Sequence, residues 1–230
     1  MASRDQPPEP RPARRTLAEE AAATLHEQIL SGEIPSGTPL RLIELSKRLG
    51  MSPMPIREGL RRLESLGLVE IIPHRGAWVR ELSAEDLRDT YMTRAELESL
   101  AIRRAAPRFT DADGNAATQA LEEHVQQSLA GETAAARKAH TEFHFALYRA
   151  AGSRALPRAI EPVWQNGERY RPARESGALI EQVRREHQAI LDACAGHDAD
   201  AAEAALRAHI EGAMERILHT MTRDLNEQDG

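Results

Sequence analysis

The sequence predicts a mainly α-helical protein in two parts, in which three helices and a β-hairpin are followed by an all-α antiparallel bundle. Three observations support this prediction. Alanine, leucine, glutamate and arginine dominate the 230 residues and aromatic residues make up only 3%, a composition that favours helix over sheet. Two short β-rich runs follow the first three helical segments. After residue 83 no strand pattern occurs. Three helices followed by a hairpin is the order of a winged helix-turn-helix.

The first part begins with a tail and two helices. Residues 1–15 are expected to be disordered, because prolines alternate there with charged residues and no apolar residue recurs regularly. Helical spacing of apolar residues starts at Thr16, which can cap the helix together with Glu19. This helix is expected to end at Leu30, before a loop rich in glycine and proline. A second, shorter helix is expected over residues 42–49.

A third helix and a hairpin complete this part. The helix is expected to begin after Ser52, its N-cap, with Pro53 in its first turn, and to end at Gly67. Its apolar residues share one face: Ile56, Leu60, Leu63 and Leu66. Residues 68–72 and 77–80 then predict two strands around a glycine-containing turn.

The second part is expected to be a bundle of six or seven helices. Ser83 and the acidic residues after it form a capping pattern that opens the first of these helices. Helices are expected at about residues 83–106, 112–129, 132–151, 154–170, 177–195 and 199–222. The expected breaks lie at Asp113-Gly114, Gly131, Gly152, Pro172 and Gly196-His197-Asp198. The chain therefore divides into the tail, a first domain at 16–82, a second at 83–222 and a C-terminal tail at 223–230.

Cysteine usage and hydropathy exclude several classes of protein. Cys194 is the only cysteine, which excludes an internal disulfide framework and a cysteine-rich zinc module. No apolar run approaches the roughly 18 residues of a membrane span, so no membrane partner is expected. The N-terminal residues lack the apolar stretch of a signal peptide, and the expected location is the cytoplasm.

The net charge of −6 is unevenly divided along the chain. Residues 1–82 carry a net charge of +1 and residues 83–230 a net charge of −7. The acidity therefore belongs to the predicted bundle, whereas the basic residues of the first domain cluster on its third helix and hairpin. The overall charge does not exclude a nucleic-acid partner, and non-specific binding to DNA should be modest and salt-sensitive.

The third helix and the hairpin contain the residues that a DNA-reading module needs. The second helix of a helix-turn-helix enters the major groove with its N-terminal turns, and a helix N-terminus with Ser52 suits a phosphate. Arg57 lies one turn further, where it can pair bidentately with guanine. An ordinary solvated basic face is the alternative, but the arrangement of helices and hairpin argues against it. The residues expected to contact DNA are Ser52, Pro53, Met54, Arg57, Arg61, Arg62, His74, Arg75 and Gly76.

The segment SGEIPSGTPLRLIELSKRLGMSPMPIREGLRRLESLGLVEIIPHRGAWV resembles the DNA-binding domain of GntR-type bacterial transcription regulators, and the resemblance covers about residues 16–82. Two positions depart from the family pattern. Pro53 stands where many members have arginine, and Met54 stands where threonine is usual. The resemblance implies a homodimer that binds a palindromic double-stranded DNA operator, with base reading that rests on Arg57 and the hairpin.

Four of the nine histidines form a second pattern, in the predicted bundle. His140 and His144 are four residues apart, so both imidazoles lie on one face of a helix, which is a common spacing for two metal ligands. His187 and His209 lie among apolar residues of later helices, and a bundle can bring all four histidines together. From the residues alone two interpretations stay open, a metal site and histidines of an ordinary core.

The second half of the chain, about residues 84–222, resembles the all-helical effector (FCD) domain of the FadR-like branch of GntR regulators. The resemblance is carried by four segments, at residues 94–98, 143–147, 185–191 and 208–210. It implies a metal held by His140, His144, His187 and His209, in which His140 replaces the usual aspartate or asparagine. Imidazole ligands suit zinc, nickel, copper or iron and disfavour magnesium and calcium. The expected cofactor is therefore a divalent transition metal, zinc or nickel first.

The same resemblance implies a pocket for a small organic acid, whose carboxylate the metal and an arginine would hold. Arg94 is the candidate arginine, because a guanidinium fork matches carboxylate geometry. The alternative for Arg94 is an intrahelical ion pair with Glu98. The other residues expected to line the pocket are Tyr91, Trp164, Asn166 and Arg169.

These features together predict a ligand-responsive DNA-binding transcription regulator, as a repressor of a metabolic operon, and not an enzyme. One alternative keeps the DNA binding without a metal, the histidines then being core residues or direct effector contacts. A remote alternative is a histidine-ligated metalloenzyme. Glu142 and Glu186 adjoin ligand candidates in the sequence, but neighbouring residues on a helix face different directions, so neither is expected to act as a general base.

Overall fold

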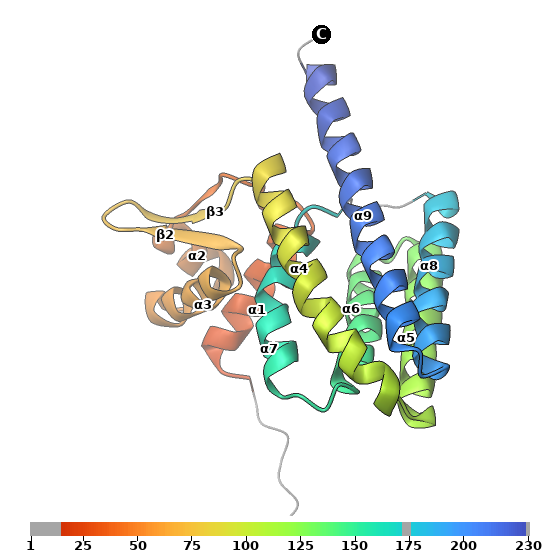
Figure 1. The fold of residues 1–230 in the computed structure, drawn as a ribbon. Coiled ribbons are helices and arrows are strands. Elements are labelled where there is room, and N and C mark those ends of the chain that lie inside the picture. The colour runs from red at the N-terminus through yellow and green to blue at the C-terminus, as the bar shows by residue number, and fades with distance from the viewer. Residues whose placement is uncertain (1–14, 172–175, 229–230) are drawn as a thin grey trace, which may run out of the picture.

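The computed structural model describes residues 15–171 and 176–228, which form two parts lying side by side (Figure 1). Residues 1–14 of the expected tail and the expected break at Pro172 lie outside the described residues. Within the described part, no helix combines the length and the apolar character that crossing a membrane requires. The predicted fold class, a small hairpin-bearing part followed by a helical bundle, is confirmed.

The N-terminal part, called the head below, consists of three helices and a three-stranded antiparallel sheet in the order β1-β3-β2. The predicted hairpin is formed by β2 (Val69–Ile72) and β3 (Gly76–Val79), with Val69 opposite Val79. A third strand, β1 (Pro39–Leu40), pairs with β3 and was not predicted, because two residues in a proline-containing loop show no alternation of polarity. The helices are α1 (Leu17–Leu30), α2 (Leu42–Leu49) and α3 (Pro53–Ser65).

Capping and close packing fix the head. The hydroxyl of Thr16 accepts a hydrogen bond from the N–H of Glu19 at 3.2 Å, and the Glu19 carboxylate accepts one from the N–H of Thr16 at 2.9 Å, which is the predicted capping box. Helix α3 packs against α1 at Gly59, where an added Cβ would lie 3.1 Å from the backbone nitrogen of Ala22. The core between these helices includes the fully buried side chains of Leu25, Ile56, Leu63 and Leu68.

The second part, called the bundle below, has six α-helices within the described residues, as the sequence predicts. Its first helix is capped by Ser83, whose hydroxyl accepts a hydrogen bond from the N–H of Asp86 at 3.0 Å. A short 3-10 turn, Ala106–Arg108, separates the first two helices. The helices are α4 (Ala84–Ala105), α5 (Asp111–Ala130), α6 (Thr133–Arg149), α7 (Ala155–Glu168), α8 (Gly177–Ala195) and α9 (Ala199–Gln228).

The expected break at Asp113-Gly114 is wrong. Helix α5 begins at Asp111 after Thr110 as N-cap, and the Asp113 carboxylate accepts a hydrogen bond from the N–H of Thr110 at 3.0 Å. Asp113 therefore helps to start the helix, and Gly114 lies inside it. A capping box satisfies two backbone donors at once, which outweighs the helix-breaking tendency of one glycine.

Helix α9 is longer than expected. It continues past residue 222, where a tail was expected to begin, as far as Gln228, and Figure 1 shows its C-terminal turns extending beyond the bundle. After Gly212 the next glycine or proline is Gly230. Nothing in the intervening sequence therefore stops a helix.

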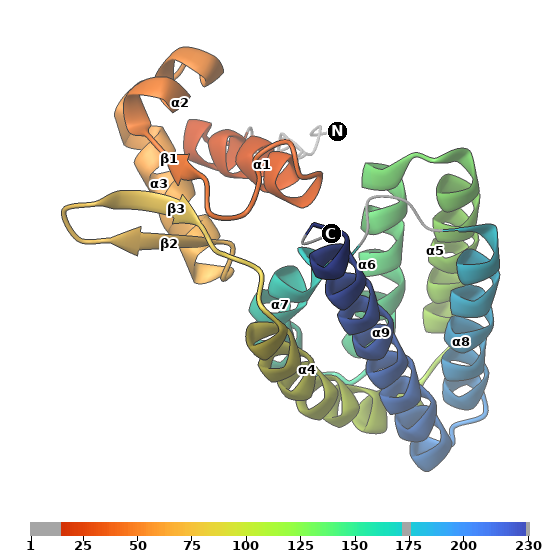
Figure 2. The same cartoon turned by 90° about the horizontal axis from the view of Figure 1, so that it is seen from above.

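The head meets the bundle at α6 and α7. A ring nitrogen of His26 on α1 lies 2.7 Å from the side-chain oxygen of Gln165 on α7. The guanidinium of Arg137 on α6 donates to the carbonyl of Leu30, at the C-terminal end of α1. Figure 2 shows α7 between the head and the other helices of the bundle. The head is thus seated on helices that also carry the site described next.

Candidate nucleic-acid interface and candidate metal centre

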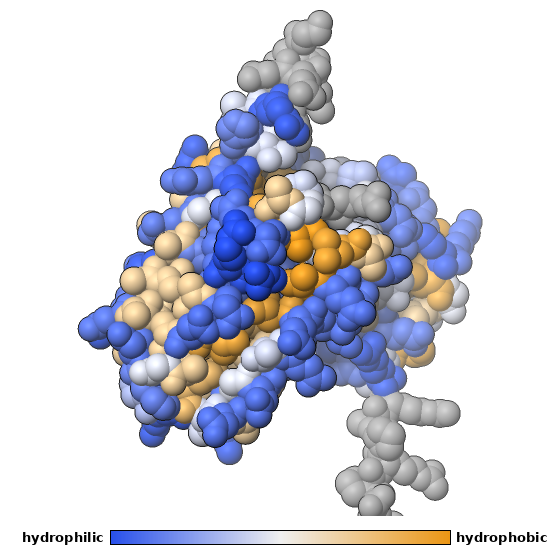
Figure 3. All heavy atoms as spheres, turned by 90° about the vertical axis from the view of Figure 1, so that its right-hand side faces the viewer, coloured by the Kyte–Doolittle hydropathy of each residue, from blue (hydrophilic) through white to orange (hydrophobic). Residues whose placement is uncertain are grey.

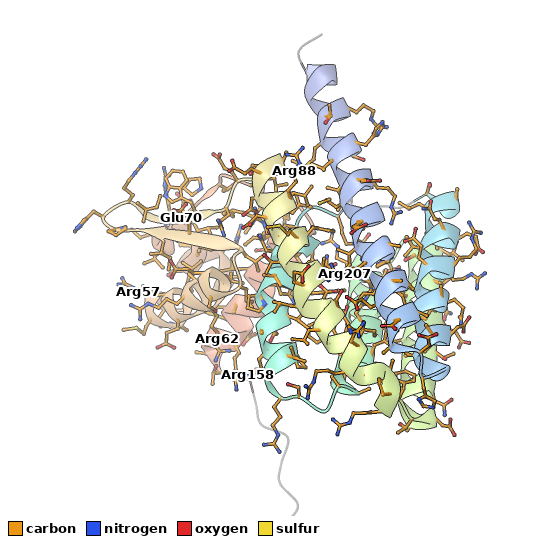
Figure 4. All side chains as sticks on the ribbon, viewed as in Figure 1. Arg57, Arg62, Glu70, Arg88, Arg158 and Arg207 are labelled. Atoms are coloured by element: carbon orange, nitrogen blue, oxygen red, sulfur yellow. The ribbon has the colours of Figure 1, made fainter. Side chains whose placement is uncertain are left out.

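The outward face of α3 carries exposed polar side chains. Arg57 and Arg61, four residues apart, are exposed, whereas Ile56 and Leu60 are buried in the head. Figure 4 shows Arg57 projecting from the head on the side remote from the bundle. Ser52 is the N-cap of α3, yet its hydroxyl makes no capping hydrogen bond. Pro53 and Pro55 have no N–H, so the N–H of Met54 is the donor that the first turn of α3 presents to an anion such as a phosphate.

Arg62 is placed differently from Arg57. One of its terminal nitrogens donates to a carboxylate oxygen of Glu19 at 3.2 Å, and both side chains are partly exposed. A pair of this kind contributes little stability, but it directs the guanidinium toward α1. Helix α3 thus presents two arginines to solvent and a third that α1 holds.

The turn between β2 and β3 together with the first residue of β3, residues 73–76, is called the wing turn below. His74 and Gly76 have φ angles of 63° and 94°, in the left-handed region, and the N–H of Arg75 donates to the carbonyl of Ile72 at 3.0 Å. Gly76 suits this backbone because it has no Cβ. All nine residues predicted to contact DNA are exposed on α3, its N-cap and the wing turn: Ser52, Pro53, Met54, Arg57, Arg61, Arg62, His74, Arg75 and Gly76.

Four buried histidines lie together inside the bundle. One ring nitrogen from each of His140, His144, His187 and His209 lies within 4.8 Å of the others. The first two come from successive turns of α6, and the others come from α8 and α9. His124 of α5 is buried beside them, with its ring centroid 5.1 Å from that of His140. The structure thus brings together the four histidines that the sequence singled out.

Tyr148 and Glu98 orient His144. The hydroxyl of Tyr148 donates to Oε2 of Glu98 at 2.5 Å, so the hydroxyl oxygen of Tyr148 accepts from Nδ1 of His144 at 3.1 Å. This arrangement leaves Nε2 of His144 without a proton, 3.1 Å from Nε2 of His187. Glu98 also accepts a hydrogen bond from Nε of Arg94 at 2.7 Å. One buried carboxylate therefore supports both a histidine and an arginine.

Glu186 supports His209 in the same way. One of its carboxylate oxygens lies 2.8 Å from Nδ1 of His209, and the carboxylate also accepts two hydrogen bonds from Arg216, at 3.0 and 3.1 Å. Burial raises the pKa of Glu186, but the hydrogen bonds from His209 and Arg216 outweigh it and lower the pKa to about 2. A carboxylate that binds Nδ1–H leaves Nε2 free for a metal.

His140 has an arginine and a carboxylate beside it as well. Nη1 of Arg171 lies 2.5 Å from Nδ1 and 2.9 Å from Nε2 of His140. Because a guanidinium has only donors, His140 is the acceptor and is neutral. The buried carboxylate of Glu168 lies 3.7 Å from Nδ1 of His140 and 3.5 Å from Nη1 of Arg171. Three of the four histidines therefore have a carboxylate and an arginine in their surroundings.

The donor set fits a transition metal. Burial lowers the pKa of His140, His144 and His187 well below the ordinary value, and it also lowers that of His209. All four are therefore neutral imidazoles, the form that binds metal ions. His187 is fully buried, yet its Nδ1 has no hydrogen-bond partner among the described residues. Arg171 opposes metal binding at His140, because an ion bound to His140 would have to displace the guanidinium of Arg171.

A cavity of about 340 Å³ lies beside the histidine cluster and includes His140 and His209 in its wall. Its charged wall contains Arg94, Glu168, Arg169, Arg171 and Arg216, and its apolar wall contains Leu179, Val183, Ile210, Ala213, Ile217 and Met221. Figure 3, which views the side where α8 lies in Figure 1, shows apolar surface between charged rims. A cavity of this size and mixed character suits a small organic molecule with an anionic group.

Three of the five residues that the sequence suggested for an effector pocket line this cavity: Tyr91, Arg94 and Arg169. Arg94 combines both interpretations given for it, because it lines the cavity while it forms the intrahelical pair with Glu98 at 2.7 Å. The pair does not remove Arg94 from the cavity. It holds the guanidinium in place there.

The other two residues suggested for that pocket, Trp164 and Asn166, are not among the residues that line this cavity. Trp164 is fully buried, and its ring stacks on His140 with centroids 5.2 Å apart. Asn166 donates to Thr90 at 2.7 Å and to Asp86 at 3.1 Å, near the junction with the head. Spacing along α7 could not show which of its residues face the cavity and which face the neighbouring helices.

Sequence reasoning missed several residues of this site. Tyr148 lies four residues after His144, the same spacing that singled out His140, so this pattern could have identified it. Glu186 was expected to face away from the histidines. Its carboxylate instead contacts His209 on α9. Arg216 lies on α9, seven residues after His209, a spacing that places both on one helix face. Glu168 and Arg171 come from the end of α7 and the segment after it, and no local pattern connects them with the histidines.

Two family descriptions match the chain. The description "Bacterial regulatory proteins, gntR family" matches residues 17–79, and the description "FCD domain" matches residues 89–212. The first match coincides with the head, and the second lies within the bundle and contains all four histidines of the cluster.

Relatives and solved structures agree with these matches. The chain is 29% identical to the probable D-xylose utilization operon transcriptional repressor of Paenarthrobacter nicotinovorans, over 90% of this chain and 91% of that protein. It is 30% identical to the Nta operon transcriptional regulator of Aminobacter aminovorans, over 83% of this chain and 90% of that protein. The solved structure of E. coli McbR/YncC has a TM-score of 0.78 at 23% identity, covering 90% of this chain and 100% of that one. This last likeness shows a shared fold.

Proposed function

Because the chain belongs to the GntR family of bacterial regulatory proteins and carries an FCD domain, it is a DNA-binding transcription regulator, and we propose that a small carboxylate bound beside a metal ion controls its binding to an operator. The observation that carries this proposal is the cluster of four neutral histidines next to an arginine-lined cavity. The relatives are transcription regulators and not enzymes, so the metalloenzyme alternative is set aside.

The head reads double-stranded DNA through α3 and the wing turn. Ser52 and the N–H of Met54 hold a phosphate, and Arg57 reaches base edges in the major groove. A homodimer places two heads about one helical turn apart on a palindromic operator. Support for this assignment comes from the exposure of all nine predicted contact residues on one helix and one turn.

The histidine cluster holds a divalent transition metal, zinc or nickel. Four imidazoles without a carboxylate are a donor set that magnesium and calcium do not prefer. The hydrogen bonds of His144 with Tyr148 and of His209 with Glu186 support this assignment, because they occupy Nδ1 of each ring and leave Nε2 for the ion. The bound ion supplies positive charge at the wall of the cavity.

The cavity binds the effector, a small carboxylate. Arg94 is held in the wall by Glu98 and can receive the carboxylate in its guanidinium fork. The side chains of α8 and α9 provide an apolar wall for the rest of the molecule. Binding shifts the population between operator-competent and incompetent arrangements, by an amount set by the differential affinity of the carboxylate for the two. The regulator acts as a repressor of a metabolic operon.

Metal analysis and ligand screening of the purified full chain test this proposal. We expect about one equivalent of zinc or nickel per chain, together with a rise in melting temperature when citrate, succinate, lactate or pyruvate is added to metal-loaded protein. His144→Ala should abolish both the metal and the carboxylate response. A metal content below about a tenth of an equivalent per chain, after purification without chelators, would favour the alternative without metal if the protein still responds to the carboxylate.

A further inference from the structure

Arg169 lies at the junction of the head and the bundle, directly after α7, and is only 8% exposed. Its Nη2 donates to the carbonyl of Arg80 at 2.6 Å and to that of Glu81 at 3.0 Å, and its Nη1 donates to the carbonyl of Gly67 at 3.1 Å. Gly67 follows α3, and Arg80 and Glu81 follow β3. A single side chain of the bundle therefore holds both segments that leave the DNA-reading elements of the head.

The acceptors around Arg169 are all neutral. Besides the three carbonyls it donates to the side-chain oxygen of Asn166, at 2.8 Å. Within the described ranges no carboxylate lies at ion-pair distance from Arg169, whereas the other three arginines of the cavity each have one: Arg94 with Glu98, Arg171 with Glu168 and Arg216 with Glu186. A buried guanidinium binds a carboxylate more strongly than it binds neutral carbonyls. Arg169 is therefore the cavity arginine that gains most from an incoming anion.

Arg169 also lines two cavities. It lines the cavity beside the histidine cluster, and it lines a second cavity of about 190 Å³ together with Ile34 and Val79 of the head. Leu82, in the connection between head and bundle, lines both cavities as well. An anion in the larger cavity therefore meets the same guanidinium that holds the head.

We propose that Arg169 is the positioning residue through which the cavity controls the head. With the cavity empty, Arg169 fixes the segments after α3 and β3, and an anion bound in the cavity withdraws its guanidinium and frees them. This rests on the proposed function, because the anion is taken to be the carboxylate effector. The arrangement with Arg169 in place is the one that binds operator, since a dimer must hold its heads at the spacing of two half-sites.

The first test replaces Arg169 by Gln in the full chain without any effector. Arg169→Gln keeps an amide donor but removes the charge and the reach to three carbonyls. We expect amide exchange at residues 67–68 and 80–83 to accelerate about tenfold or more, and operator affinity to fall about tenfold. Arg158→Gln, which removes an exposed arginine from α7, should change neither quantity. Unchanged exchange in Arg169→Gln, with its melting temperature preserved, overturns the proposal.

The second test places an anion beside Arg169 by mutation. Leu82→Glu supplies a carboxylate at both cavities, and Leu82→Gln is the matched neutral control. We expect Leu82→Glu to weaken operator binding about tenfold and Leu82→Gln to stay within about twofold of the wild type. In an Arg169→Gln background, Leu82→Glu should cause no further loss of operator affinity. Equal losses of operator affinity in Leu82→Glu and Leu82→Gln overturn the proposal. Both tests run without effector, so a failure of the proposed function appears separately, as an absence of metal or carboxylate binding by the wild type.

Discussion

The hydroxyl of Tyr148 lies 2.5 Å from Oε2 of Glu98, and this contact links the histidine cluster with the cavity. Through Tyr148 the carboxylate fixes the tautomer of His144, and directly it holds Arg94 in the cavity wall. A candidate metal ligand and a candidate carboxylate receptor therefore share one buried support. Disturbing that support should affect metal and effector together.

Replacing Tyr148 by Phe tests this link. The substitution removes the acceptor for Nδ1–H of His144 while it nearly conserves the volume of the side chain. We expect zinc affinity to fall about 10- to 100-fold, the usual cost when a metal-binding histidine loses the hydrogen-bond partner of its other ring nitrogen. Competition with a chromophoric zinc chelator measures this change. Glu142→Gln, at an exposed position on α6, serves as the control, and equal zinc affinities for the two variants would show that Tyr148 does not orient the ligand.

The four histidines should not contribute equally to metal binding. Because the guanidinium of Arg171 lies against His140, an ion that uses His140 must first displace it. His140→Ala is therefore expected to lower zinc affinity less than His144→Ala does, by about tenfold against about a hundredfold or more. Chelator competition on both variants gives the comparison. An equal loss would show that His140 is a full ligand and that Arg171 moves aside at little cost.

Arg57 should be needed for operator recognition. Arg57→Ala removes an exposed guanidinium at the tip of the reading surface, and a lost bidentate base contact costs about 1–3 kcal/mol per half-site. We expect specific binding to a selected operator to fall at least tenfold in a fluorescence anisotropy titration, with melting temperature and oligomeric state unchanged. Arg158→Ala, which removes an exposed arginine from α7 of the bundle (Figure 4), controls for the loss of charge. An unchanged footprint of Arg57→Ala would remove Arg57 from the interface.

Most of the fold follows from local patterns in the sequence. The capping residues Thr16 and Ser83 and the left-handed Gly50 mark helix ends through interactions within a few residues, and such interactions are visible in a single sequence. The boundary at Asp113 was missed because the same two residues suggest a turn or a capping box, and only the position of Thr110 decides between them. Strand β1 exists only because β3 pairs with it.

The site was predictable to a smaller extent. His140 and His144 share one helix face through their spacing, and His187 and His209 stood out because they lie among apolar residues of later helices. The family resemblance then implied that all four are metal ligands. The groups around them could not be found in this way. Arg171 reaches His140 from the segment after α7, and the packing of whole helices sets that contact. The role of Arg169 is likewise invisible in the sequence, because its acceptors are backbone carbonyls, which every residue carries.

The close approach of α1 and α3 gives a prediction about the stability of the head. At Gly59 an added Cβ would lie 3.1 Å from the backbone nitrogen of Ala22 and 3.2 Å from the carbonyl oxygen of Ala18. Alanine is favoured over glycine in a helix by about 1 kcal/mol, but backbone atoms cannot move aside as the end of a side chain can. We expect Gly59→Ala to destabilise the head by about 1–2 kcal/mol net, the range of overpacking in a filled core.

Thermal unfolding followed by circular dichroism, together with amide exchange in α1 and α3, measures this effect. Gly177→Ala is the matched control, since Gly177 also lies in a helix but an added Cβ there meets nothing within 4 Å. That control should be neutral or slightly stabilising, because only the helix propensity changes. A stabilised Gly59→Ala head would mean that the two helices separate at low cost, and the position of α3 would then not depend on its contact with α1.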